Sequence, residues 1–142
     1  MKLTNDQIYA LQAAGIGKIN YSKLNPVDAI SVYRLRRDVV AAIRDLNGIR
    51  DELIEAGWED KDLLHKVQKY EASHEGMTED EYKAAMEANM PKVAAMMVEV
   101  GKEERDINVK PITFTSWLQL LQDNPRLAGF EELLADFIND ND

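Results

Sequence analysis

The feature that most constrains this chain is a heptad pattern in residues 26–56. Apolar residues recur there at alternating spacings of three and four, which places them along one stripe of an α-helix. Asn25 can cap this helix, Pro26 suits its first position, and Gly57 is placed to end it. At about 1.5 Å per residue, the helix should be about 45 Å long. The stripe consists of Val32, Leu35, Val39, Ala42, Leu46, Ile49 and Leu53.

A second long helix is predicted over residues 79–104, where Thr78 and Glu81 form a capping box at its start. Its apolar stripe consists of Met86, Met90, Val93, Met97 and Val100. Pro91 lies inside this helix, so we expect a kink or a restart there, with Asn89 as a local cap. Because the two stripes have similar lengths, they predict a long antiparallel helical hairpin. The alternative is that the first stripe forms a seam between two chains.

Shorter helices are predicted near both ends, which makes the expected fold mainly α in a single helical domain over residues 1–142. They are residues 5–14 after the capping box of Thr4 and Gln7, a helix capped by Thr115, and residues 130–138 after Gly129. Residues 18–21 and 106–112 alternate polar and apolar side chains, and their pairing would give one small two-stranded β-ribbon. Residues 58–77 form a polar connection that is either a short helix or a mobile segment, and residues 139–142 are expected to fray.

Charge and composition exclude several classes of protein. The chain has 17 basic and 26 acidic residues, and its formal net charge of −9 disfavours binding to nucleic acid or to anionic membranes. The absence of cysteine excludes disulfides, thiolate zinc sites and thiol catalysis. Residues 93–98 are the longest apolar run, far short of the roughly 20 residues that a membrane-spanning helix needs. The first residues lack the apolar core of a signal peptide. We therefore expect no direct nucleic-acid partner and no membrane partner.

The sequence contains no arrangement typical of an active site. His65 and His74 are not spaced as two ligands on one helix face would be. No nucleotide-binding motif and no hydrolase motif is present. Acidic clusters such as Asp51, Glu52 and Glu55 are typical of solvated helix faces. We therefore expect no enzymatic activity, no cofactor and no metal.

Two patterns are compatible with binding a protein partner. Four arginines give the long helix a positive face, namely Arg34, Arg36, Arg37 and Arg44. This face is either a surface held by ion pairs, such as Arg34 with Asp38, or a site for an acidic partner or phosphate. The methionines of the second helix form either core or an adaptable binding surface. The stripes together predict a homo-oligomer, with the candidate interaction surface Val32, Leu35, Val39, Leu46, Ile49, Leu53, Met86, Met90, Val93 and Met97.

Two stretches of the chain carry a resemblance to known proteins. The first is LNPVDAISVYRLRRDVVAAIRDLNGIRDELIEAGWEDKD, and the second is MMVEVGKEERDINVKPITFTSWLQLL. Together they resemble a family of small phage and prophage proteins of unknown function. The matching residues are Leu53, Ile54, Glu55, Gly57, Asp60 and Asp62 in the first stretch, and Glu99, Val100, Ile107, Ile112 and Leu118 in the second. The resemblance covers residues 24–122.

This resemblance implies a non-enzymatic, phage-encoded accessory or virion-assembly protein. Such a protein acts through contacts with its own copies, or with phage or host proteins, in the host cytoplasm or in the virion. The net charge of −9 leaves one alternative, an acidic inhibitor that mimics nucleic acid and blocks a host nucleic-acid-binding protein.

Overall fold

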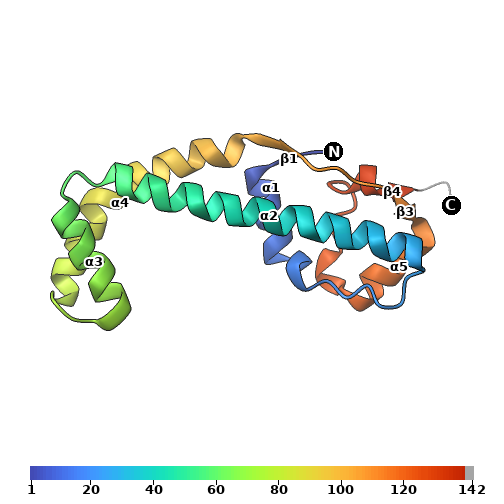
Figure 1. Ribbon diagram of the computed structural model, residues 1–142, viewed down its shortest axis with the longest axis horizontal. Helices are drawn as coiled ribbons and strands as arrows, with labels where there is room; N and C mark the ends of the chain where they lie inside the picture. Colours follow the sequence, from blue (N-terminus) through green and yellow to red (C-terminus); the bar gives the residue numbers. More distant parts are fainter. Residues whose placement is uncertain (140–142) are drawn as a thin grey trace. The chain divides into compact units, whose positions relative to one another are not determined.

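The computed structural model describes residues 1–139, which divide into two compact units (Figure 1). Within the described residues, unit 1 comprises Met1–Asp45 and residues 102–139, and unit 2 comprises Leu46–Gly101. The predicted fold class is confirmed, because the chain is mainly α with long helices and a small antiparallel two-stranded sheet. The long helix α2 (Pro26–Gly57) contributes residues to both units and has the bounds that the heptad pattern predicts.

Unit 1 combines short helices with two small sheets. Besides the first part of α2, its elements are β1 (Lys2–Thr4), α1 (Asn5–Ala13), η1 (Ile16–Lys18), β2 (Glu104–Asp106), β3 (Ile112–Thr113), α5 (Phe114–Asp123), η2 (Pro125–Leu127), η3 (Ala135–Phe137) and β4 (Ile138–Asn139). Strand β1 pairs with β2 in antiparallel fashion, and β3 pairs with β4 in parallel. The largest fully buried side chains of this unit are Leu3, Ile8, Leu11, Ile16, Leu35, Ile112, Trp117, Leu120 and Phe137.

The start of the chain forms the predicted helix but also an unpredicted strand. The Thr4 hydroxyl accepts from the Gln7 backbone N–H at 3.1 Å, which confirms the capping box of α1. The predicted ribbon partner is wrong, since β2 pairs with residues 2–4 and not with residues 18–21. The reason is local, because Gly15 has a φ of +92° and turns the chain into the short helix η1.

The end of the chain departs from the predicted helix over residues 130–138. Turns replace it, followed by η3 and by β4, which pairs Ile138 with Ile112. Leu134 and Phe137 are each 1% exposed, so both side chains are buried although residues 130–138 do not form a continuous helix. Of the predicted frayed tail, Asn139 lies in β4, and residues 140–142 lie outside the described residues.

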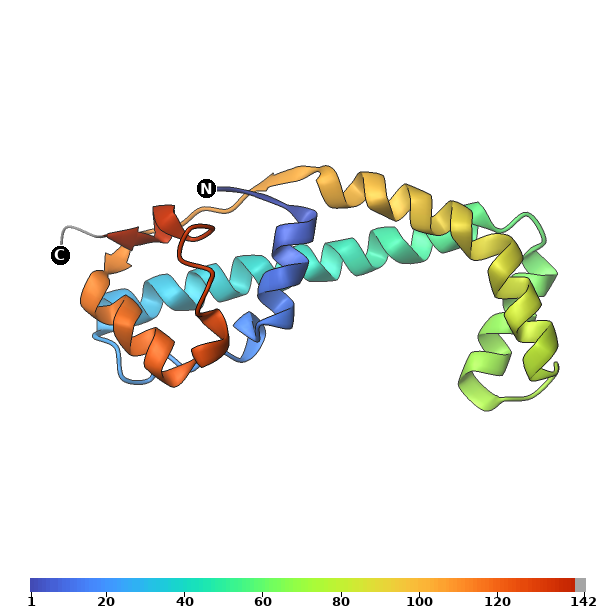
Figure 2. The same cartoon turned by 180° about the vertical axis from the view of Figure 1, so that it is seen from behind.

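Unit 2 contains the remainder of α2 together with α3 (Lys61–Ser73) and α4 (Glu79–Lys102). In this unit the end of α2 and the later part of α4 lie side by side and run in opposite directions, while α3 lies beside the beginning of α4 (Figure 2). The polar connection over residues 58–77 is therefore mostly helix. The hydrophobic core cluster of unit 2 consists of Trp58, Leu64, Val67, Ala85 and Val93.

Helix α4 starts as predicted, because the Thr78 N–H donates to Glu81 Oε1 and the Glu81 N–H donates to Thr78 Oγ1, both at 3.1 Å. The helix continues through Pro91 without a restart, and Figure 2 shows that it bends near its middle. Asn89 is not a cap, since its Nδ2 donates to the Ala85 carbonyl at 2.8 Å within the helix.

Candidate functional site

The predicted interaction surface is mostly covered within the chain. Val32, Leu35, Val39, Leu46 and Val93 are at most 2% exposed, and Ile49, Leu53, Met86, Met90 and Met97 are half-buried. The three methionines of this set contact the core cluster around Trp58. Surfaces that are open to a partner therefore have to be sought among other residues.

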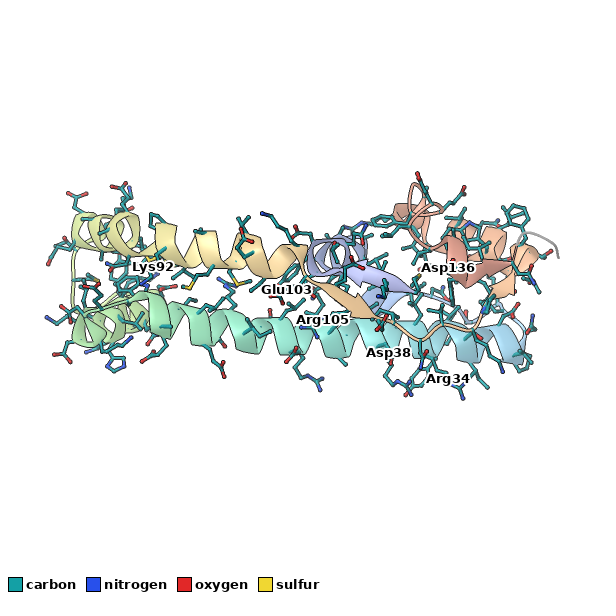
Figure 3. All side chains as sticks on the ribbon, turned by 90° about the horizontal axis from the view of Figure 1, so that it is seen from above. Arg34, Asp38, Lys92, Glu103, Arg105 and Asp136 are labelled. Carbon is teal, nitrogen blue, oxygen red and sulfur yellow. The ribbon has the colours of Figure 1, made fainter. Side chains whose placement is uncertain are left out.

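A cleft in unit 1 brings together the basic helix face and a segment that lies far away in the sequence. It has a volume of about 470 Å³ and is lined by Arg34, Arg37, Asp38, Asn108, Val109 and Lys110. Figure 3 shows Arg34 and Asp38 projecting from α2 beside the extended segment that follows β2. We call this cleft the basic cleft. An adjoining hollow of about 430 Å³ shares Asp38 with it and is also lined by Ala41, Ala42, Arg105, Asp106 and Ile107.

The basic cleft carries three cationic side chains and one carboxylate. Asp38 accepts from Arg37 Nε at 3.2 Å, so the predicted pair of Arg34 with Asp38 is wrong. Neither Arg34 nor Lys110 makes an ion pair with any described residue. Two cations that line one cleft without an ion-pair partner among the described residues favour an anionic ligand there.

Residues 108–110 form the wall of the basic cleft that faces α2, and the chain is attached to α2 on both sides of these residues. On one side, Arg105 donates through Nη2 to Asp45 Oδ2 at 2.6 Å and through Nε to Asn5 Oδ1 at 2.7 Å. On the other side, Thr113 and Ser116 hydrogen-bond to Asp28. The segment between these two attachments is therefore held beside α2, and the buried Ile107 and Ile112 contribute to holding it there.

Asp28 is the polar centre of the second attachment and is 4% exposed. Its Oδ2 accepts from Thr113 Oγ1 at 2.9 Å, from Ser116 Oγ at 2.5 Å and from Asn25 Nδ2 at 3.0 Å. Burial by itself raises the pKa of this carboxyl group, but the hydrogen bonds from Ser116, Thr113 and Asn25 outweigh burial, so the pKa lies below its ordinary value. Through Oδ2 the carboxylate joins the start of α2 to Thr113 and to α5, and this role is structural.

Between the attachments, residues 108–110 make no hydrogen bond to any described residue, through either backbone or side chain. Asn108 and Lys110 are exposed, and Val109 is half-buried. All three residues line the basic cleft, and their backbone groups have no hydrogen-bond partner among the described residues.

Unit 2 has a separate, smaller hollow of about 270 Å³ beside Trp58, Met86 and Met90. The Trp58 indole N–H is buried without a hydrogen-bond partner among the described residues. His74 ends α3 with a φ of 56° and contacts Tyr70 edge-on, with ring centroids 5.2 Å apart.

Over residues 1–139, no group of three or more His, Asp or Glu side chains is arranged to hold a metal ion. None of the helices in that range has the length and hydropathy to cross a membrane.

Comparison with protein-family models, curated proteins and solved structures found no match for this chain. The resemblance to small phage proteins gains no support from these comparisons.

Proposed function

We propose that this chain is a non-enzymatic interaction protein whose basic cleft binds an acidic segment of a protein partner. The observation that carries the proposal is the position of Arg34 and Lys110, which line one cleft and have no ion-pair partner among the described residues. In a chain with a net charge of −9, acidic residues are abundant, yet only Asp38 lies among the residues that line this cleft.

A short acidic segment suits the cleft better than a long polyanion such as nucleic acid does. At about 0.15 M salt, charges interact over about 8 Å, so a short segment responds mainly to the local cations. A polyanion would extend beyond the cleft over a surface whose net charge is negative, and it would be repelled there.

The resemblance over residues 24–122 adds an expectation about context. It favours an accessory or assembly role in phage biology, in which the acidic partner is a phage or host protein in the host cytoplasm or in the virion. This part of the proposal depends on the resemblance alone.

The proposal is tested with a fluorescein-labelled peptide of about ten residues in which glutamate alternates with valine. Binding is measured by fluorescence anisotropy, and a peptide with glutamine at every glutamate position is the control. We expect micromolar affinity for the acidic peptide only, and a decrease in affinity as salt is added.

The matched variants reverse two charges each. Arg34→Glu combined with Lys110→Glu should weaken binding at least tenfold, which is about 1.4 kcal/mol. Lys66→Glu combined with Lys69→Glu changes the net charge equally on the exposed face of α3 and should leave the affinity within about twofold. Equal binding of the glutamate and glutamine peptides, or equal losses in the two double variants, would contradict the proposal.

A further inference from the structure

The backbone of residues 108–110 continues from a strand whose pairing stops just before it. In the β1–β2 ladder, Lys2 lies opposite Asp106. The Ile107 N–H then donates to the Met1 carbonyl at 2.7 Å, and the Met1 amino group donates to the Ile107 carbonyl at 3.1 Å. Residues 108–110 make no hydrogen bond to a described residue, and backbone pairing resumes at Ile112, which lies opposite Ile138 in the β3–β4 sheet.

From this arrangement we infer that the acidic partner segment binds in the basic cleft as an added β-strand along residues 108–110. The inference rests on the proposed function and specifies the conformation of the partner. An unpaired extended segment is a template for another chain, because it presents N–H and C=O groups at a strand's spacing. Here the two attachments, at Arg105 and at Thr113, keep that template in place before the partner arrives.

The charges of the cleft suit a strand whose carboxylates are two residues apart. Side chains at alternate positions of a strand point to the same face, about 6.7 Å apart. Arg34 and Lys110 line the cleft without an ion-pair partner among the described residues, whereas Arg37 already contacts Asp38 at 3.2 Å. One carboxylate of the partner can therefore meet Arg34, and the next one on the same face can meet Lys110. The side chains on the opposite face of the strand would not need to be acidic.

The space along this wall is large enough for several residues of such a strand. The basic cleft and the adjoining hollow have volumes of about 470 and 430 Å³, each within the usual range for ligand sites. Residues 105–110 each line one of these two hollows, and six residues of strand span about 20 Å. Ala41 and Ala42 in the hollow offer a small apolar wall, against which apolar side chains of the partner segment can lie.

The decisive experiment uses the glutamate–valine peptide and two N-methylated forms of it. One form carries N-methyl groups on the odd-numbered backbone amides and the other on the even-numbered amides. Alternate N–H groups of a strand face opposite edges, so only one form should lose affinity, by at least tenfold, while the other binds within about threefold of the parent. Amide hydrogen exchange of residues 108–110, followed by NMR, should slow when the parent peptide is bound.

The outcomes separate this inference from the proposed function. If the parent peptide binds but both methylated forms bind equally well, or lose affinity equally, the strand addition is wrong and the charge-based function survives. Unchanged exchange of residues 108–110 in the bound state leads to the same conclusion. If the parent peptide does not bind, the proposed function fails first.

Discussion

At the scale of single residues, Asp28 shows why a helix start can be predicted when its tertiary role cannot. Asn25 and Asp28 indicate the start of α2 from the sequence, and the Asp28 N–H does donate to Asn25 Oδ1 at 2.9 Å. The bonds from Thr113 and Ser116 join residues more than 80 positions apart, and no local pattern indicates them.

Replacing Asp28 with asparagine should destabilise unit 1. The amide keeps the shape of the side chain but loses the charge that strengthens the hydrogen bonds from Thr113, Ser116 and Asn25. We expect a loss of about 1–3 kcal/mol in the free energy of unfolding, measured by urea denaturation at pH 7. Asp51→Asn is the control, because Asp51 is exposed and makes no hydrogen bond with a described side chain, and it should change stability by less than about 0.5 kcal/mol.

The same carboxyl group gives a pH dependence with a defined sign. Its pKa in the folded state lies below the ordinary value of 3.8 that applies to the unfolded chain. Between the two values the unfolded state binds more protons, so stability falls as the pH falls. The advantage of the wild-type chain over Asp28→Asn should be constant near neutrality and shrink below about pH 4. An advantage that grew on acidification would contradict the assigned pKa direction.

At the scale of elements, patterns within one element predicted the structure well, and patterns that needed a distant partner did not. The capping boxes at Thr4 and at Thr78 are confirmed, since both involve contacts three residues apart. The cap of α5 is Thr113 and not the predicted Thr115, because the strand β3 fixes the chain just before that helix. The failed helix over residues 130–138 likewise depends on pairing with β3.

Two glycines of α2 should respond to alanine with opposite signs. A Cβ at Gly57 would lie 2.6 Å from Val93 Cγ2 and 3.4 Å from Met96 Cε, so Gly57→Ala should cost about 1–3 kcal/mol of stability. A Cβ at Gly48 would meet nothing within 4 Å, and Gly48→Ala should stabilise the helix by about 0.5–1 kcal/mol. Both changes in stability are to be measured by chemical denaturation, and a stabilising Gly57→Ala would show that α4 does not approach α2 this closely.

At the scale of the whole molecule, the sequence predicts only one side of the candidate site, the side on α2. The arginines on α2 were visible as a positive face, but the cleft exists because residues 108–110 lie opposite them. The sequence of that segment does not by itself indicate binding. The segment matters because its backbone makes no hydrogen bond to a described residue. The methionine stripe was visible too, yet much of its area is covered by α2 and α3 in unit 2.

The exposed apolar surface through which we expect self-association lies at the start of α2, not on the methionines of α4. Met86, Met90, Met96 and Met97 are only half-exposed, whereas the start of α2 exposes Val27 by 69%, Ile30 by 52% and Tyr33 by 44%. These three side chains recur every three residues on one stretch of helix, and exposed apolar patches commonly mark interfaces. We therefore expect a homodimer through this stretch at micromolar concentration, with a mass near twice 16.1 kDa by light scattering.

Ile30→Asp should return the dimer to monomers, because it places a charge within an apolar contact. Val98→Asp is the matched control, since Val98 is 56% exposed on α4, and this variant should leave the dimer intact. Association through apolar surface should also persist as salt is raised, whereas binding of an acidic peptide to the basic cleft should weaken. A mass near 16.1 kDa at every concentration would refute the dimer and leave the stretch from Val27 to Tyr33 to a different protein.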